Sequence, residues 1–150
     1  MRTTGIGERI VVPAEVETLA TIAVNAAFEV HRELGPGLLE SAYEAAFAWE
    51  LESQGVRFQR QVPVPVHYKG RRIELGFRAD VLMGSRLLVE LKAVEGILPV
   101  HKAQVITYLK VLNLPLGLLI NFNEVLIKDG LRRVLNLRHD ATRSPVLLTQ

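Results

Sequence analysis

The sequence predicts an α/β fold in which helices flank a mixed β-sheet, with elements in the order α-α-β-β-β-α-β-β. Three observations lead to this prediction. Apolar residues recur at helical spacing through the first third of the chain. Segments with period-two alternation and short apolar runs follow. A further helical segment then separates the meander from the last strands, and such a crossover implies a mixed sheet with helices packed on it.

Two helices are predicted in the first 55 residues. The first runs from Pro13, a residue suited to the first helical turn, to about Leu34, and Gly35-Pro36-Gly37 ends it. The second runs from about Leu38 to Ser53 and is closed by Gly55. The apolar positions that repeat along the first helix are Val16, Leu19, Ala20, Ala23, Ala27 and Val30.

A meander of three strands is predicted next. The residues from Val62 to Tyr68 alternate with period two, and Pro63 and Pro65 fall on the opposite parity. Two prolines in one strand indicate a sheet edge, because proline cannot donate a backbone hydrogen bond. Lys69-Gly70 is typical of a hairpin turn. The second and third strands are predicted over Ile73–Met83 and Leu87–Ala93.

The remaining elements are a helix and two strands. Pro99 opens the helix, which runs to about Asn113. Apolar runs predict strands over Leu116–Phe122 and Leu131–Leu135. We expect one domain over residues 1–150 with a core at about 14–136. The last dozen residues carry little pattern, and we expect loose termini.

The composition excludes several classes of protein. Of the 150 residues, 49% are hydrophobic and 23% charged, which is typical of a globular domain and not of a disordered chain. The absence of cysteine excludes disulfides, thiolate zinc sites, iron–sulfur clusters and cysteine nucleophiles. No secretory signal and no membrane-spanning segment is predicted. We therefore expect a soluble, cytoplasmic protein.

The charge is distributed unevenly along the chain. Residues 1–55 contain three Lys/Arg and nine Asp/Glu, whereas residues 56–150 contain fifteen and seven. A basic second half is compatible with a polyanionic partner. An acidic helical layer covering a basic sheet layer would produce the same distribution. The charge alone leaves both interpretations open.

Charged residues interrupt two segments that otherwise resemble buried strands. The apolar run Leu87–Val94 contains Glu90 and Lys92, and the preceding strand contains Asp80. Burying such charges is costly unless they are paired or bind a metal. Two carboxylates and an ammonium on neighbouring strands would suit Mg²⁺. A salt bridge of Glu90 or Asp80 with Lys92 or Arg78 on an exposed face is the alternative.

The metal interpretation depends on the loop between these two strands. A two-residue turn at Gly84-Ser85 would pair Asp80 with Val89 and point it away from Glu90. A three-residue loop from Gly84 to Arg86 would set Asp80 directly across from Glu90. The metal interpretation therefore predicts the longer loop or a bulge.

Two helical faces carry further candidate residues. On the second helix, Glu40 shares a face with Tyr43, and a first-turn carboxylate that only serves the helix end would explain Glu40 but not Tyr43. On the third helix, Gln104 and Tyr108 share a face that could contact a phosphate or a base, or could simply be solvated. His101 lies on this face too, and we expect it to be exposed rather than to be a metal ligand. The same two roles are open for His31.

These segments together resemble the PD-(D/E)xK nuclease superfamily. Asp80 with Glu90-Leu91-Lys92 resembles its core signature, and Gln104-Val105-Ile106-Thr107-Tyr108 resembles the Gln-x-x-x-Tyr element of its RecB-like branch. Gly37-Leu38-Leu39-Glu40-Ser41-Ala42-Tyr43 matches the signature of the GxxExxY proteins, which are assigned to that superfamily. The resemblance runs from about residue 14 to 136 and includes Glu29–Gly37, Leu118–Phe122 and Lys128–Leu131.

The resemblance implies a restriction-endonuclease-like core with one added helix. It implies that Asp80, Glu90 and the carbonyl of Leu91 hold Mg²⁺ or Mn²⁺, with Glu40 as an accessory acidic ligand, direct or through water. Lys92 would position the attacking water and stabilise transition-state charge. Gln104 and Tyr108 would orient the scissile phosphate or support Lys92.

The chain departs from the family pattern at three points. Ala79 replaces the proline before the aspartate, a common change. The cysteines that bind an iron–sulfur cluster in some RecB-like nucleases are absent. The histidine ligand typical of that branch has no clear counterpart unless His31 serves.

The predicted function is metal-dependent hydrolysis of phosphodiester bonds in nucleic acid, with DNA as the expected polymer. Two alternatives stay open: a non-catalytic nucleic-acid-binding module, and a protein-interaction module, as a homodimer or a member of a larger complex. No base-reading element is apparent. The residues expected to contact phosphates are Arg57, Arg60, Arg71, Arg72, Arg78 and Lys102.

Overall fold

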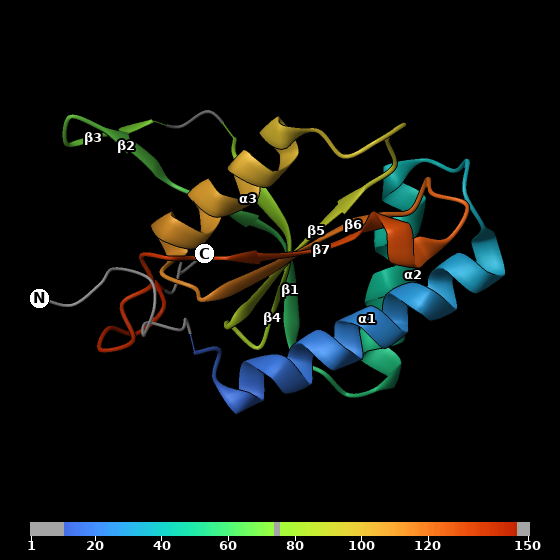
Figure 1. Cartoon of the computed structure of the whole chain (residues 1–150). Helices are drawn as coiled ribbons and strands as arrows, with labels where there is room; N and C mark the ends of the chain where they lie inside the picture. Colours follow the sequence, from blue (N-terminus) through green and yellow to red (C-terminus); the bar gives the residue numbers. More distant parts are fainter. Residues whose placement is uncertain (1–10, 74–75, 147–150) are drawn as a thin grey trace, which may run out of the picture.

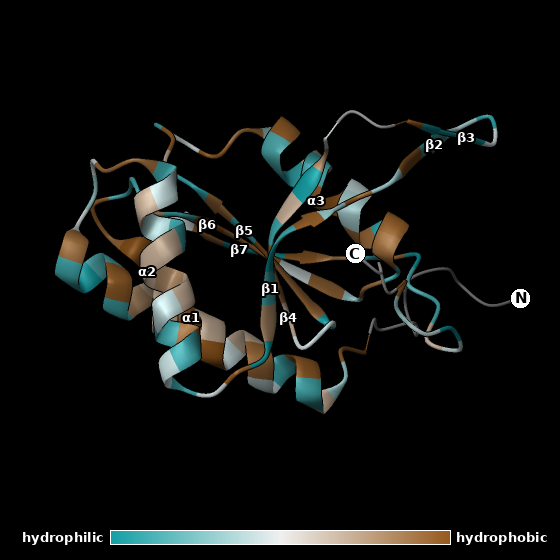
Figure 2. Cartoon of the chain, turned by 180° about the vertical axis from the view of Figure 1, so that it is seen from behind, coloured by the Kyte–Doolittle hydropathy of each residue, from teal (hydrophilic) through white to brown (hydrophobic). Residues whose placement is uncertain are grey.

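The structure, a computed structural model, describes residues 11–73 and 76–146. A five-stranded sheet in the order β1-β4-β5-β6-β7 lies between helices α1 and α2 on one face and helix α3 on the other (Figure 1). Strands β2 and β3 form a separate hairpin that projects away from the sheet in both views (Figures 1 and 2). The predicted α/β class, a mixed sheet flanked by helices, is confirmed.

The three predicted helices are present with slightly shifted ends. They are α1 (Ala14–Leu34), α2 (Glu40–Ser53) and α3 (Pro99–Leu112). Gly35 follows α1 with a φ of 65°, and Asn113 follows α3 with a φ of 53°. Left-handed residues end helices in this way because they turn the chain out of the helical path.

The region predicted as two strands forms four. These are β1 (Phe58–Pro63), β2 (Val66–Tyr68), β3 (Arg71–Ile73) and β4 (Arg78–Met83). The single strands predicted over Val62–Tyr68 and Ile73–Met83 were therefore wrong in extent, and part of the second falls on residues 74–75, outside the described residues. Pro63 and Pro65 break the first strand because they lack a backbone donor. Gly76, with a φ of 71°, turns the chain before β4.

Other strand predictions are confirmed. Strand β1, which ends at Pro63, is an edge of the sheet, as Pro63 and Pro65 indicated. The β2–β3 turn lies at Lys69-Gly70, and both residues have positive φ. Strands β5 (Leu87–Lys92) and β6 (Leu116–Asn121) are parallel and connected through α3, and β7 (Leu131–Leu135) is antiparallel to β6. A short 3₁₀ helix, η1 (Ile127–Gly130), precedes β7.

Alternate residues of the sheet belong to two apolar clusters, one on each face. In Figure 2 the central strands are coloured mainly as hydrophobic. Leu87, Val89 and Leu91 of β5 pack toward α1 and α2, whereas Leu88 packs toward α3. Helix α3 approaches β6 closely at Gly117, where a Cβ would lie 2.8 Å from Val105 Cγ1. The strands that carry the candidate site are therefore covered on both faces.

The described residues after β7 make hydrogen bonds to the end of α3. The side chain of Asn113 donates to the carbonyls of Asp140 and Arg143 at 3.1 Å, and the Val146 N–H donates to the Leu112 carbonyl at 2.9 Å. A left-handed asparagine at the end of α3 thus makes hydrogen bonds to residues 140 and 143. Residues 1–10 and 147–150 lie outside the described part of the chain.

Hydropathy along the helices gives one further result. Within residues 11–73 and 76–146, none of the helices combines the length and apolar character that a bilayer crossing requires.

Candidate active site

The β4–β5 loop has three residues, as the metal interpretation predicted. Met83 pairs with Leu87, Leu82 with Leu88 and Val81 with Val89, so that Gly84, Ser85 and Arg86 form the connection. The Arg86 N–H donates to the Met83 carbonyl at 3.0 Å. Continued by one position, this register sets Asp80 across from Glu90.

Beyond the Val81–Val89 pair, β4 and β5 are joined by hydrogen bonds between backbone N–H groups and the carboxylates of Asp80 and Glu90. The Asp80 N–H donates to Oε1 of Glu90 at 2.9 Å, and the Leu91 N–H donates to Oδ2 of Asp80 at 2.8 Å. Glu90 is only 3% exposed. The two carboxyl groups are thus held side by side where β4 and β5 stop pairing.

Burial and proximity change the acidity of Glu90. Desolvation, followed by the nearby Asp80 carboxylate, raises the pKa of Glu90 to about 8, although the Asp80 N–H and the Lys92 ammonium act in the opposite direction. In the metal-free protein Glu90 therefore keeps its proton to a higher pH than an ordinary glutamate. A cation at this position would favour the ionised form of Glu90.

Helix α2 brings Glu40 to the same place. Partial desolvation raises the pKa of Glu40, the Lys92 ammonium lowers it, and Asp80 raises it again. A hydrogen bond from the Ala93 backbone also lowers it. Glu40 therefore lies near the end of β5, although Asp80 and Lys92, whose charges affect it, are far away in the sequence.

Tyr43 explains how the start of α2 is fixed. Its hydroxyl donates to the Gly35 carbonyl at 2.6 Å and accepts from the Leu38 N–H at 3.1 Å. Its ring stacks on Phe122 with a centroid separation of 4.6 Å. The tyrosine of the Gly-x-x-Glu-x-x-Tyr segment thus holds the loop that precedes Glu40.

Helix α3 contributes Tyr108 and Gln104. Burial, then the carboxylates of Glu90 and Asp80, raises the pKa of Tyr108, and a hydrogen bond with Gln104 lowers it. Tyr108 therefore lies close enough to the carboxylate pair to be affected by its charge, and Gln104 lies beside Tyr108. All six predicted catalytic residues, Asp80, Glu90, Lys92, Glu40, Gln104 and Tyr108, are therefore gathered at one end of the sheet.

The two histidines have structural contacts. His101 Nδ1 accepts the Leu98 N–H at 2.9 Å and caps the start of α3. Nε2 of buried His31 lies 2.7 Å from the Glu124 carbonyl. No described interaction connects His31 to the carboxylate pair within residues 11–73 and 76–146.

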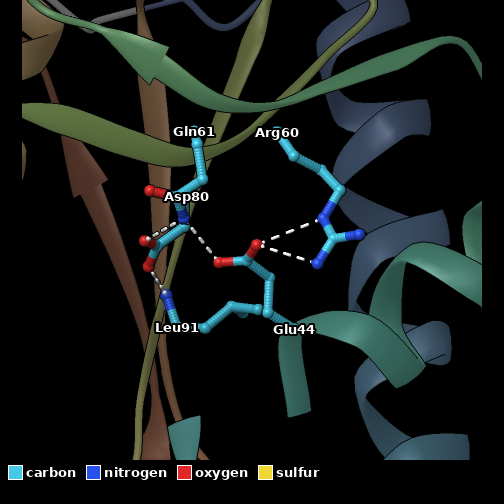
Figure 3. A network of polar contacts seen from close by, with 5 residues as sticks. All are labelled: Glu44, Arg60, Gln61, Asp80 and Leu91. Atoms are coloured by element: carbon cyan, nitrogen blue, oxygen red, sulfur yellow. Dashed lines mark hydrogen bonds and ion pairs between the residues drawn. The ribbon is translucent and has the colours of Figure 1, made fainter. Parts of the chain in front are cut away.

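A polar network that the sequence analysis missed adjoins Asp80 (Figure 3). Glu44 accepts from Nε of Arg60 at 3.1 Å and from the side-chain amide of Gln61 at 2.7 Å. The same amide lies 3.3 Å from Oδ1 of Asp80. Glu44 lies one helical turn after Glu40 on α2, whereas Gln61 fell just outside the strand predicted from Val62 and carried no signal.

The six predicted phosphate-contacting residues are dispersed. Arg60 and Arg78 lie beside the network, where Arg78 donates to the Gln61 carbonyl at 3.2 Å. Arg71 and Arg72 lie on the projecting β2–β3 hairpin, and Lys102 is exposed on α3. Arg57 precedes β1 at the opposite end, where its carbonyl accepts from the Gly84 N–H. The structure does not bring Arg57 to the carboxylate pair.

The donors fit a divalent cation that retains water. Across the described residues, no group of three or more His, Asp and Glu side chains is close enough to ligate one ion alone. The carboxylates of Asp80 and Glu90 are the hard oxygen donors here, with the carbonyl of Leu91, the residue directly after Glu90, as a further oxygen. Mg²⁺ suits such a set, because it commonly binds one or two carboxylates and completes its shell with waters and substrate phosphates.

Comparison with known proteins gives one match. The family model described as the PD-(D/E)XK nuclease superfamily matches residues 17–134, more than half of the chain. This span contains all six gathered residues. No curated protein and no solved structure matches the chain significantly.

Proposed function

This chain belongs to the PD-(D/E)XK nuclease superfamily, and from that premise we propose that it is a divalent-metal-dependent nuclease that hydrolyses phosphodiester bonds of DNA. One observation carries the proposal: Asp80 and Glu90 face each other on adjacent strands, with Lys92 two residues further along β5. The Gly37–Tyr43 and Gln104–Tyr108 segments support a closer relation to the RecB-like branch and its GxxExxY proteins.

In this proposal, Asp80, Glu90 and the Leu91 carbonyl hold the ion, with Glu40 as an accessory ligand. When bound, a divalent ion supplies Lewis acidity and lowers the pKa of a coordinated water. The Lys92 ammonium lies among these carboxylates, where it positions the attacking water and stabilises negative charge that develops on the phosphate. Gln104 and Tyr108 orient the phosphate from α3 or support Lys92.

Cleavage assays test the proposal. Labelled single- and double-stranded DNA and RNA are incubated with Mg²⁺ or Mn²⁺ and the wild-type protein, Lys92→Ala or Asp80→Asn. We expect DNA cleavage that requires the ion and falls by about 10²-fold or more in both variants, because each removes a group that acts on the transition state. Lys110→Ala, which removes an exposed lysine from the last turn of α3, is the control.

The outcomes separate this proposal from its alternative, a binding module that has lost catalysis. Metal-dependent cleavage that persists unchanged in both variants would contradict the assigned roles. Binding of DNA without cleavage of any polymer, together with no Mn²⁺ binding in calorimetry, would favour the binding module.

A further inference from the structure

Strand β1 is distorted opposite Asp80. Its pairs with β4 are regular at Arg60↔Val81 and at Val62↔Ala79, but Gln61 between them has a φ of 51°. Side-chain-bearing residues rarely adopt this left-handed conformation, least of all within a strand. Such strained positions concentrate at functional sites, where the surrounding contacts maintain them.

The distortion directs the Gln61 side chain into the polar network (Figure 3). Its Nε2 donates to Oε1 of Glu44 at 2.7 Å and to Oδ1 of Asp80 at 3.3 Å. We propose that Gln61 is a positioning residue that fixes the Asp80 carboxylate for metal binding and is itself held by Glu44. This inference rests on the proposed nuclease function and adds a residue outside the Asp-Glu-Lys signature.

Both oxygens of Asp80 are then held from different strands. Oδ2 accepts the Leu91 N–H from β5 at 2.8 Å, and Oδ1 accepts the Gln61 amide from β1. Each carboxylate oxygen has two lone pairs, so one hydrogen bond on each leaves acceptor capacity for a cation. Hydrogen bonds to ligating carboxylates orient them in this way in metal sites.

The chemical nature of glutamine matters for this role. A neutral amide donates to Asp80 without supplying a positive charge that would compete with a metal ion. Glu44, whose side chain is 12% exposed, fixes the same amide, and its own charge is balanced by Arg60 through a 3.1 Å ion pair. The network therefore connects α2 with the β4 carboxylate.

Two substitutions separate positioning from simple space filling. Gln61→Gly removes the amide, and glycine readily adopts the observed φ. Gln61→Glu keeps the shape but replaces the donor with an acceptor that faces Asp80 and Glu44. Gln59→Gly and Gln59→Glu are the matched controls, because Gln59 is exposed on the same strand opposite Leu82.

Two readouts are measured on folded proteins, as shown by thermal unfolding. Calorimetric titration with Mn²⁺ alone should show dissociation constants raised about tenfold or more in both Gln61 variants, with Gln61→Glu at least as impaired as Gln61→Gly. In the metal-free protein, hydrogen exchange of the Leu91 amide should be faster in both, because a less ordered Asp80 carboxylate holds it less well. Both Gln59 variants should behave as the wild type.

Unchanged Leu91 exchange in both Gln61 variants would overturn the proposal. So would unchanged Mn²⁺ affinity, or a Gln61→Glu protein that matches the wild type. If the wild-type protein neither binds Mn²⁺ nor cleaves nucleic acid, the proposed nuclease function fails, and the Leu91 exchange still decides whether Gln61 orders Asp80.

Discussion

At the scale of single residues, Glu90 should make the stability of the metal-free protein depend on pH. In the folded protein the pKa of Glu90 is raised to about 8 by burial and by Asp80, whereas in the unfolded chain it returns to about 4.5. Between these values the unfolded chain has released a proton that the folded chain keeps. Stability should therefore fall as the pH rises through this window, by at most about 1.4 kcal/mol per pH unit from this group.

Urea unfolding in the presence of a chelator at pH 5.5 and 7.5 measures the effect. The free energy of unfolding should decrease between the two pH values in the wild type and decrease less in Glu90→Gln, whose amide does not titrate. An equal decrease in both proteins would show that other groups cause it.

The site residues that the sequence could reveal were charged residues within otherwise apolar strand segments. Asp80, Glu90 and Lys92 interrupt apolar strands, and burial of charge there needed an explanation. Gln61 is polar in a polar stretch, and its role depends on a left-handed φ that no residue-type preference indicates. Glutamine is not among the residues that favour this conformation, so only the folded context reveals it.

At the scale of elements, the β2–β3 hairpin has a position and a charge that would suit contact with a polyanion. It leaves β1 and returns to β4 beside Gln61 and Asp80, and it projects from the body (Figure 1). From Val64 to Ile73 the sequence has three Lys/Arg and no acidic residue, and Tyr68 is 60% exposed. A hollow of about 220 Å³ at its base is lined in part by Arg72 and Arg78.

If this hairpin contacts phosphates, its charges should contribute to DNA affinity in a salt-dependent manner. We expect Lys69→Ala/Arg71→Ala to weaken binding of duplex DNA and to reduce the slope of log K against log salt by about 2, since each phosphate contact contributes about 0.9. Fluorescence polarisation with Ca²⁺ in place of Mg²⁺ measures binding. Lys110→Ala/Lys128→Ala removes the same charge from exposed positions elsewhere and should have little effect; equal weakening would contradict a specific role for the hairpin.

The elements also show where sequence patterns were insufficient. The helices and the strands β5, β6 and β7 were predictable because each has a continuous periodic or apolar pattern. The division into β1, β2, β3 and β4 was not, because Pro63, Pro65 and Gly76 end pairing at points that the alternation of Val62, Val64 and Val66 passes over. A period of two is compatible with one long strand or with two short ones.

At the scale of the whole molecule, the uneven charge distribution is partly explained by contacts between layers. Arg86 pairs with Glu15, Arg133 with Glu17, and Arg60 with Glu44, and each pair joins an acidic helix to the basic sheet. The two exposed pairs, Arg86–Glu15 and Arg133–Glu17, each contribute at most about 1 kcal/mol. The acidic helical layer on a basic sheet layer is therefore present, and Lys69 and Arg71 of the hairpin and Lys102 of α3 lie outside these three pairs.

The carboxylate pair should make the stability of the whole molecule depend on divalent ions. An ion that binds only the folded state stabilises it by about 2.7 kcal/mol at a concentration 100 times its dissociation constant. For a chain of this length we expect the unfolding midpoint to rise by about 5–10 °C in Mn²⁺ or Mg²⁺. The rise should be larger at pH 8 than at pH 5.5, because the ligands bind metal in their ionised form and Glu90 is largely protonated at the lower pH.

Thermal unfolding of Asp80→Asn and Glu90→Gln should show little rise, whereas Glu52→Gln, which alters an exposed carboxylate near the end of α2, should respond as the wild type. An equal rise in all four proteins would place the ion away from the carboxylate pair and would remove the physical basis for its role in catalysis.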